Sequence, residues 1–275
     1  MTIEIRNIKV GNNNPFVLIA GPCVVESEEL ILSTAKRISE ITQKLEIPFI
    51  FKSSFKKANR TNINSFSGIG DERAIRILKK VRDELGIPVL TDIHSESDIE
   101  KVINSVDVIQ IPAFLCRQTD LLLAAGNSGL AVNIKKGQFL APEDMKHAAD
   151  KVASTGNSKI LFTERGTTFG YHNLVVDMRS LIVMHEIGYP VVMDATHSVQ
   201  LPSNSNVSGG QPKFIKPLAR AAAAVGIDAL FLEVHPEPSK ALSDAASQLP
   251  LSELEELLVD VKKIDKVIKS ASKRN

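Results

Sequence analysis

The chain has 275 residues, of which 43% are hydrophobic and 24% charged, and its formal net charge is +1. This hydrophobic content is enough for a full core, so we expect a single α/β domain over residues 1–275. The near-zero charge argues against non-specific nucleic-acid binding, and the absence of Trp argues against base-stacking surfaces.

Short apolar runs alternate with helical patterns along most of the chain. Residues 2–10 alternate weakly and predict a short strand or hairpin ahead of the main fold. Strands are predicted at 16–20, 49–51, 88–91, 106–111, 130–134, 159–163, 191–193 and 229–232. Each precedes a predicted helix, at 27–44, 71–85, 97–105, 119–126, 142–154, 174–186, 214–225 and 251–269, with Ser27 as the first N-cap.

Eight strands, each followed by a helix, are the count of a (β/α)8 TIM barrel. The strands are apolar without alternation, as parallel strands covered on both faces should be. A doubly wound open sheet is the alternative, but no Gly-x-Gly-x-x-Gly motif follows the first strand. No linker-like segment divides the chain, which favours one catalytic barrel.

The compartment is indicated by what the sequence lacks. No apolar run approaches the length of a membrane span, and residues 1–11 lack the apolar centre of a signal peptide. Cys23 and Cys116 are the only cysteines, which excludes a disulfide scaffold, and we interpret Cys116 as structural. We therefore predict a cytoplasmic protein without a membrane or nucleic-acid partner.

A basic stretch at residues 52–61 follows the second predicted strand. It carries four cations, three hydroxyls and a carboxamide, and such a run cannot enter a core because unpaired buried charges cost too much free energy. A solvated loop is the plain interpretation. The position after a strand, where α/β proteins bind ligands, favours a phosphate site instead.

Polar residues follow every predicted strand, and two groups stand out. One is cationic and indicates a substrate with several negative charges: Lys52, Lys57, Arg60, Lys135 and Arg165. The other is a potential site for a divalent transition metal such as Fe, Mn, Co or Zn, formed by Cys23, His197, Glu233 and Asp244. Considered one at a time, each has a plainer interpretation. Cys23 would be a buried thiol and His197 a loop histidine, while Glu233 would be an ion-pair partner and Asp244 a helix or turn cap. Together they follow strands that are neighbours in a closed barrel.

Several motifs resemble the 3-deoxy-D-manno-octulosonate 8-phosphate synthases, and the resemblance extends from about residue 16 to the last helix. The motifs are Lys-Ala-Asn-Arg-Thr at 57–61, Ile-Gln-Ile-Pro-Ala-Phe-Leu at 109–115, Asn-Ile-Lys-Lys-Gly-Gln at 133–138, Glu-Arg-Gly at 164–166, Phe-Gly-Tyr at 169–171, Asp-Ala-Thr-His-Ser at 194–198 and Glu-Val-His-Pro at 233–236. The related heptulosonate synthases use a different basic loop, and the sialic-acid synthases share less still.

The resemblance implies a cytoplasmic homotetrameric TIM barrel that condenses phosphoenolpyruvate with D-arabinose 5-phosphate for lipopolysaccharide core synthesis. By the same resemblance, Lys57 lies between the two substrates and Arg117 reaches a neighbouring subunit's site. The residues implied to hold phosphoenolpyruvate are Lys52, Ser54, Gln110, Lys135 and Arg165, and those implied to hold the pentose phosphate are Asn59, Arg60 and Thr61.

The family has a metal-dependent branch with Cys at the position of Cys23 and a metal-free branch with Asn there. Cys23 places this chain in the metal-dependent branch, with Cys23, His197 and Asp244 also counted, like Lys57, among the catalytic residues. One departure is that Gln211 precedes Pro-Lys where the family has Arg-Glu, which concerns a loop salt bridge and not the chemistry. The alternatives are another aldose phosphate acceptor, or a barrel that binds a sugar phosphate without turnover.

Overall fold

The computed structural model describes residues 1–60, 62–168, 170, 172–201 and 209–272. At its centre, eight parallel strands form a ring, which closes because the last of them pairs with both the first and the seventh. These strands are β3 (Val17–Gly21), β4 (Phe49–Lys52), β5 (Val89–Asp92), β6 (Val108–Ile111), β7 (Ala131–Lys135), β8 (Ile160–Glu164), β9 (Val191–Asp194) and β12 (Ala229–His235). The predicted (β/α)8 barrel is confirmed.

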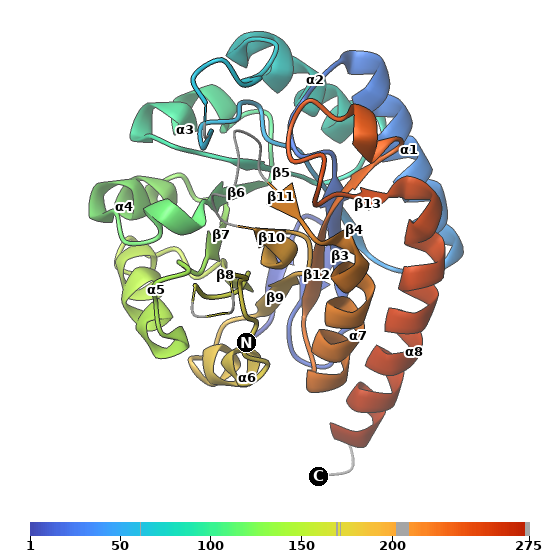
Figure 1. Cartoon of the computed structure of the whole chain (residues 1–275). Helices are drawn as coiled ribbons and strands as arrows, with labels where there is room; N and C mark the ends of the chain where they lie inside the picture. Colours follow the sequence, from blue (N-terminus) through green and yellow to red (C-terminus); the bar gives the residue numbers. More distant parts are fainter. Residues whose placement is uncertain (61, 169, 171, 202–208, 273–275) are drawn as a thin grey trace.

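Helices surround the ring on its outside (Figure 1). They are α1 (Glu28–Lys44), α2 (Asp71–Glu84), α3 (Glu96–Val102), α4 (Thr119–Asn127), α5 (Met145–Ala153), α6 (Arg179–Glu186), α7 (Ile215–Val225) and α8 (Leu254–Ser272). Every residue of the eight ring strands is buried, which explains why the strands read as continuous apolar runs. Ser27 caps α1 as predicted, because its side chain accepts from the backbone N–H of Leu30.

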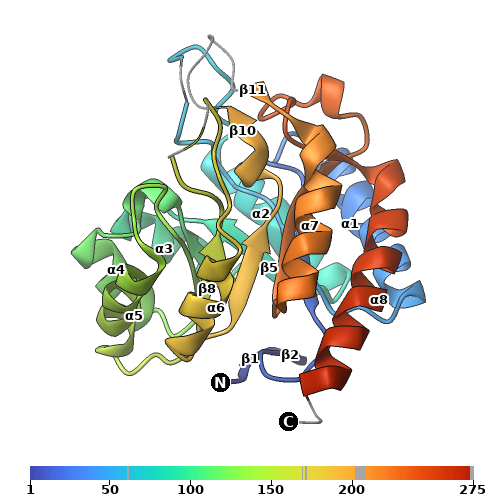
Figure 2. The ribbon, with the colours of Figure 1, turned by 60° about the horizontal axis from the view of Figure 1, so that its bottom comes forward.

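The N-terminal hairpin closes one end of the barrel. Strands β1 (Ile3–Ile5) and β2 (Ile8–Val10) pair antiparallel, and their buried side chains form one cluster with inward-facing residues such as Val17 and Phe231. Each such aliphatic side chain contributes roughly 1.5–3 kcal/mol when it is fully buried. Figure 2 shows this hairpin at the end of the barrel opposite β10 (Gln200–Leu201) and β11 (Gly209–Gly210), so the hairpin covers the amino ends of the ring strands.

The loops that follow the ring strands contain short elements of secondary structure. Strand β13 (Leu249–Pro250) extends the sheet beside β12, and 3₁₀ turns complete several loops. These turns are η1 (Ala113–Leu115), η2 (Pro142–Asp144), η3 (His197–Val199), η4 (Pro212–Phe214), η5 (Pro238–Lys240) and η6 (Leu251–Glu253). Within the described ranges, no helix combines the length and the apolar character that a membrane crossing requires.

The predicted helix over 174–186 is wrong in its first part, since α6 begins only at Arg179. Val175 instead exchanges two backbone hydrogen bonds with Thr167, each 2.9 Å long, and this bridge holds the segment extended. The carboxylate of Asp177 then accepts from the backbone N–H of Arg179 at 3.0 Å, which favours a helix start there.

Several other boundaries also differ from prediction: β6 begins at Val108 and not at 106, α5 at Met145 and not at 142, and α8 runs from Leu254 to Ser272 and not over 251–269. Helix α3 ends at Val102, short of the predicted residue 105. The last ring strand runs three residues beyond its predicted end, to His235, so that Glu233 lies within the strand itself. A side chain on a strand is held more rigidly than one on a loop, so Glu233 has a fixed position at the carboxyl end of the barrel.

Candidate active site

A cavity opens where the ring strands end, opposite the N-terminal hairpin. Five of the residues that line it are basic, namely Lys52, Lys56, Lys57, Lys135 and Arg165. The other lining residues are Ser54, Ala58, Asn59, Asp92, His94, Pro112, Ala113, Phe114, His197, Gln200, Glu233 and Asp244. In a (β/α)8 barrel this end carries the chemistry, because loops from all eight strands converge on it.

Three of the lysines are each bonded to a carboxylate from a distant part of the chain. Lys52 Nζ lies 2.7 Å from Glu233 Oε1, and Lys57 Nζ lies 2.6 Å from Asp244 Oδ2. Lys135 Nζ lies 2.7 Å from Asp194 Oδ2. These pairs are needed because an isolated buried charge would be strongly destabilising. Each of these three positive charges is therefore balanced by a carboxylate of the protein itself.

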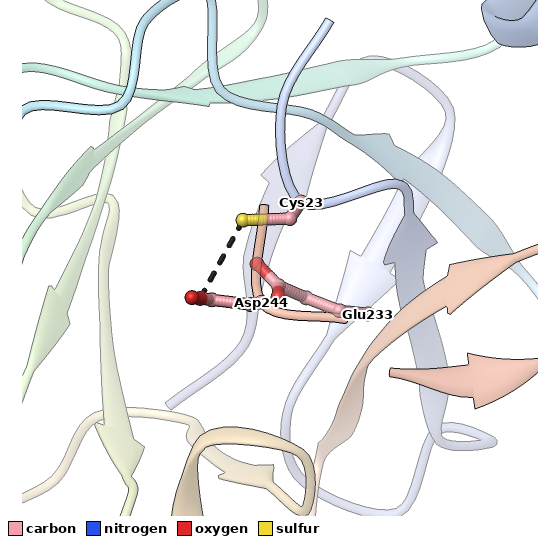
Figure 3. Close-up of side chains that lie close together, drawn as sticks. All are labelled: Cys23, Glu233 and Asp244. Carbon is pink, nitrogen blue, oxygen red and sulfur yellow. Dashed lines mark hydrogen bonds between the residues drawn. The ribbon is translucent and has the colours of Figure 1, made fainter. Parts of the chain in front are cut away.

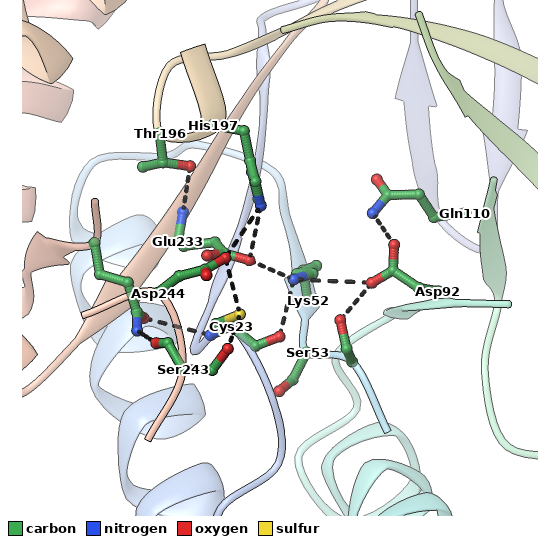
Figure 4. Close-up of polar contacts among 12 residues, drawn as sticks. Cys23, Lys52, Ser53, Asp92, Gln110, Thr196, His197, Glu233, Ser243 and Asp244 are labelled. Carbon is green, nitrogen blue, oxygen red and sulfur yellow. Dashed lines mark hydrogen bonds and ion pairs between the residues drawn. The ribbon is translucent and has the colours of Figure 1, made fainter. Parts of the chain in front are cut away.

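Lys52 is the most enclosed of these cations, and its surroundings keep it charged. It also donates to the backbone carbonyl of Cys23 at 3.0 Å (Figure 4). Burial alone would lower the pKa of Lys52, but the nearby carboxylates of Glu233 and Asp92 raise it above its usual range. Lys52 is thus a permanent positive charge at the floor of the cavity.

Arg165 presents an unsatisfied donor. Its Nη2 donates to Gln200 Oε1 at 3.0 Å, whereas its buried Nη1 has no hydrogen-bond partner among the described residues. Burial lowers the pKa of Arg165, although an arginine stays protonated under all ordinary conditions. A buried guanidinium with a free donor is suited to bind a carboxylate or phosphate oxygen.

The backbone around Arg165 is held by Glu164. One oxygen of this carboxylate accepts from the backbone N–H groups of Arg165 at 3.0 Å and Gly166 at 2.6 Å, and the other accepts from Ser180 Oγ at 2.6 Å. Gly166 has a φ of +91°, a conformation that costs little only for glycine. The Glu-Arg-Gly sequence thus fixes the direction of the arginine.

Cys23, Glu233 and Asp244 form a compact group of potential metal ligands (Figure 3). One ligand atom from each lies within 4.8 Å of the others. His197 Nε2 faces the same group, 3.5 Å from Glu233 Oε1 and 3.8 Å from Asp244 Oδ2. The structure therefore brings together all four residues of the predicted metal set, from β12 and three different loops.

The fourth candidate ligand, His197, is oriented by a carboxylate. Its Nδ1 lies 2.8 Å from Asp194 Oδ2, so the ring is held with Nε2 toward Glu233 and Asp244. A histidine that contacts a metal usually donates its other nitrogen to a carboxylate in this way. Asp194 also accepts from Lys135, so one buried carboxylate links the metal candidates to a cavity lysine.

The donor set fits a divalent transition metal. The side chain of Glu233 is only 1% exposed, so its Oε2 atom has little access to solvent. This atom also has no hydrogen-bond partner among the described residues. Burial raises the pKa of the Cys23 thiol, and the carboxylates of Asp244 and Glu233 raise it further. A cation among these atoms would satisfy the free carboxylate oxygen and favour the thiolate, which is the form that binds metals.

Asp244 is held in an unusual conformation. Its φ is +48°, a left-handed value that is uncommon for residues other than glycine and that is often found at functional sites. Burial opposes its ionisation, but Lys57 and His197 outweigh this and lower the pKa of Asp244 to about 2. Its Oδ2 also accepts from Gln200 Nε2 at 3.2 Å. The carboxylate is therefore ionised and fixed beside Cys23.

The other predicted residues lie at different depths. Ser54 and Asn59 line the cavity, whereas Arg60 is exposed and donates to the carbonyls of Ile63 and Ser65 at 3.1 and 3.0 Å. Arg117 is exposed and outside the cavity lining, and Thr61 lies outside the described residues.

Gln110 lies one layer below the cavity. It donates to Asp92 Oδ1 at 2.6 Å and accepts from Asn133 Nδ2 at 2.8 Å. Ser54 donates to the other oxygen of Asp92, and Thr163 donates to Asn133 at 2.7 Å. This chain of buried polar groups crosses neighbouring strands and leaves the Gln110 amide no direct position in the lining. Gln200 and Lys56 do line the cavity, and no sequence pattern singles out Gln200.

Comparison with known proteins agrees with this geometry. The model of the DAHP synthetase I family matches residues 1–270. The chain belongs to the DAHP synthetase I family. Within that family it is 55% identical to the 2-dehydro-3-deoxyphosphooctonate aldolase of Syntrophotalea carbinolica, over 98% of this chain and 97% of the relative. It is 54% identical to the enzymes of that name from Geotalea uraniireducens, over 97% and 98%, and Legionella pneumophila, over 98% and 99%.

These relatives confirm the resemblance to the octulosonate phosphate synthases stated from the motifs. The match extends over nearly the full length of both chains, so it includes the cavity-lining loops as well as the barrel. Three of the potential metal ligands, His197, Glu233 and Asp244, line this cavity, and the fourth, Cys23, contacts Asp244 with its Sγ 3.6 Å from Oδ2.

Proposed function

We propose that this protein is a 3-deoxy-D-manno-octulosonate 8-phosphate synthase. It condenses phosphoenolpyruvate with D-arabinose 5-phosphate and releases inorganic phosphate, in the synthesis of the lipopolysaccharide core. The observation that carries the proposal is a cavity with five basic side chains beside the Cys23, Glu233 and Asp244 group. The name shared by the curated relatives supports the same reaction.

The reaction makes a carbon–carbon bond and breaks a carbon–oxygen bond. Carbon 3 of the enol attacks the aldehyde of the pentose, water adds to carbon 2, and phosphate leaves from carbon 2. Two phosphorylated substrates repel each other, so holding them face to face requires cations as well as proximity. We assign the phosphoenolpyruvate to Lys52, Lys135 and Arg165, because these are the deepest cations of the cavity.

Lys57 lies at an intermediate depth within the basic stretch, less buried than Lys52 and more buried than Lys56. Its ammonium contacts both Asp244 Oδ2 and Cys23 Sγ, the latter at 3.4 Å. Burial would lower the pKa of Lys57, but Cys23 and Asp244 raise it well above its usual range. In the proposed function Lys57 stays charged and stabilises negative charge that develops on the aldehyde oxygen.

We further propose that Cys23, His197, Glu233 and Asp244 hold one divalent transition metal, with Fe, Mn, Co and Zn as the candidates. A metal bound there supplies Lewis acidity, by orienting the aldehyde oxygen or by activating a water. Residues 1–275 would act as one catalytic domain in a homotetramer, in which Arg117 reaches a neighbouring subunit's site. The exposed position of Arg117, outside its own cavity lining, is compatible with that role.

The proposed reaction is tested by measuring phosphate release from phosphoenolpyruvate with each of two acceptors. Arabinose 5-phosphate is expected to support turnover, and erythrose 4-phosphate is expected to support at least about tenfold less, which corresponds to about 1.4 kcal/mol of discrimination. Preference for erythrose 4-phosphate would indicate a heptulosonate-type synthase. Binding of both substrates without phosphate release would indicate a non-catalytic sugar-phosphate-binding barrel.

Replacing Arg60 by alanine is expected to weaken use of the pentose phosphate. Asn59 lines the cavity, and Arg60 follows it on the same loop with its guanidinium on the carbonyls of Ile63 and Ser65. We expect Arg60 to exchange these contacts for the phosphate when the substrate binds. Loss of a charge-assisted pair should raise the Michaelis constant for arabinose 5-phosphate more than about tenfold. Steady-state kinetics with each substrate varied in turn measure this. The constant for phosphoenolpyruvate should change little, and normal kinetics for the pentose would contradict the assignment.

A further inference from the structure

Among the described residues that line the cavity, Lys56 is the lysine without an assigned role in the proposed reaction. It lies directly before Lys57, at the start of the loop that follows β4. Its side chain is 28% exposed, compared with 18% for Lys57 and 2% for Lys52. The three lysines therefore occupy successive depths, and Lys56 is the nearest of them to solvent.

The position of Lys56 is fixed by Asp98. Its Nζ lies 2.8 Å from Asp98 Oδ1, while Asp98 Oδ2 accepts from the backbone N–H groups of His94 at 3.0 Å and Ser95 at 3.2 Å. Burial opposes ionisation of Asp98, but the bonds from Lys56 and the His94 N–H outweigh it and lower its pKa to about 2. Asp98 is thus a buried, charged anchor at the start of α3.

Lys56 keeps donors available for a ligand. An ammonium group has three N–H donors, and among the described residues Asp98 accepts the one side-chain hydrogen bond of Lys56. The ammonium also lies 5.1 Å from the centre of the Phe55 ring, which restricts its position further. A cation held in place with free donors, at the edge of an anion-binding cavity, is already arranged to bind an anionic group.

The deeper cations have other roles in the proposed reaction: Lys52, Lys135 and Arg165 are assigned to phosphoenolpyruvate, and Lys57 to the aldehyde oxygen. Lys52 and Lys57 are bonded to carboxylates of the potential metal group, and Lys135 is bonded to Asp194. The guanidinium of Arg60 contacts two carbonyls of its own loop and is outside the lining. Among the basic residues of the lining, Lys56 is therefore the one best placed to meet the outer end of a second substrate, together with Arg60 of the same loop, which we assign to the same phosphate.

We propose that Lys56 binds the phosphate group of the pentose phosphate at the mouth of the cavity, and that Asp98 is its positioning residue. The inference rests on the proposed function, since it assigns one end of a substrate of that reaction. The carbon chain of the pentose would then extend inward from this phosphate, and its aldehyde would lie toward Lys57 and the Cys23, Glu233 and Asp244 group.

The test is the kinetics of Lys56→Gln with arabinose 5-phosphate and phosphoenolpyruvate, each varied in turn. The Michaelis constant for the pentose phosphate is expected to rise about tenfold, as for loss of one charge-assisted hydrogen bond. The turnover number and the constant for phosphoenolpyruvate are expected to stay within about twofold. Lys56→Arg, which keeps the charge, should restore most of the lost affinity.

Lys101→Gln is the matched control. Lys101 Nζ lies 3.3 Å from the same Asp98 Oδ1, but Lys101 is outside the cavity lining and its side chain is 43% exposed. Both variants remove one cation from Asp98, so thermal unfolding should show similar losses of stability. Only Lys56→Gln should change the Michaelis constant for the pentose phosphate.

The outcomes separate this inference from the proposed function. Wild-type protein that releases no phosphate from the two substrates would overturn the proposed function, and this inference with it. Active wild-type protein with an unchanged pentose constant in Lys56→Gln would overturn the role of Lys56 alone. An equal rise of that constant in Lys101→Gln would also overturn it, because the effect would then come from the order of the loop around Asp98.

Discussion

Replacing Cys23 by alanine is expected to abolish metal binding and to reduce turnover by more than about 100-fold. The thiol lies 3.6 Å from Asp244 Oδ2, in a group whose Glu233 Oε2 has no other partner among the described residues. Without the sulfur, two carboxylates and His197 remain, a set that binds softer divalent ions less tightly. Elemental analysis of the purified variant and a phosphate-release assay measure the two effects.

Chelation should have the same consequence in the unchanged protein. Exhaustive chelator treatment is expected to abolish turnover, and added Mn, Co, Fe or Cd should restore it to different degrees. Because burial and the carboxylates raise the pKa of the Cys23 thiol, metal binding must displace a proton, and the metal affinity should fall as the pH is lowered. Full activity of the metal-depleted wild-type protein would exclude the site.

Two variants sharpen the experiment. Cys116 is the other buried cysteine, and Cys116→Ala should retain the metal, which controls for loss of a buried thiol in general. Cys23→Asn places at this position the residue of the metal-free branch. It is expected to lose the metal and to keep more turnover than Cys23→Ala, since its amide can donate to the carboxylate of Asp244. Metal retained by Cys23→Ala at wild-type stoichiometry would show that the thiolate is not a ligand.

Replacing Arg165 by alanine is expected to weaken phosphoenolpyruvate binding by roughly 10- to 100-fold, as for loss of a buried charge-assisted pair. The motive is the buried Nη1 atom without a partner among the described residues, on a backbone fixed by Glu164. Lys135→Ala should act in the same direction. Calorimetric titration with phosphoenolpyruvate measures the affinity without turnover.

The controls distinguish a lost contact from a damaged fold. Arg220 on α7 pairs with Asp260 on the outside of the barrel, so Arg220→Ala should leave the affinity unchanged. Arg165→Lys keeps the charge but loses the planar fork, and we expect it to lie between wild type and alanine. Lys135→Ala leaves Asp194 with His197 as its remaining ion-pair partner, so its stability must be measured separately by thermal unfolding. Unchanged affinity in both alanine variants would mean that the phosphoenolpyruvate pocket lies elsewhere.

The local pattern of the sequence predicted the barrel because its signals are short-range. The runs at 49–51 and 191–193 are apolar at every position, and each is followed by polar residues and then by a helical pattern. Strand burial on both faces dictates that composition, whatever the rest of the chain does. Boundaries were less predictable, as α6 shows, because its start depends on a backbone bridge to Thr167.

The candidate site was predictable as a set of residue types but not as a set of contacts. Positions after strands mark Lys52, Lys135 and Arg165 as cavity residues, since the carboxyl ends of parallel strands meet at one end of a barrel. The same rule placed Cys23, His197, Glu233 and Asp244 together, and the structure brings them within reach of one another.

The amino-acid sequence by itself thus determined the barrel, the end of it that carries chemistry, and the family. Only the tertiary structure decided which cation meets which carboxylate, because Lys52 and Glu233 are 181 residues apart and Lys57 and Asp244 are 187 apart. Closure of the ring sets these distances, and no local pattern encodes them. It likewise decided that Arg60 contacts its own loop while Lys56, held by Asp98, faces the cavity: a side chain's direction depends on the partners that folding brings to it.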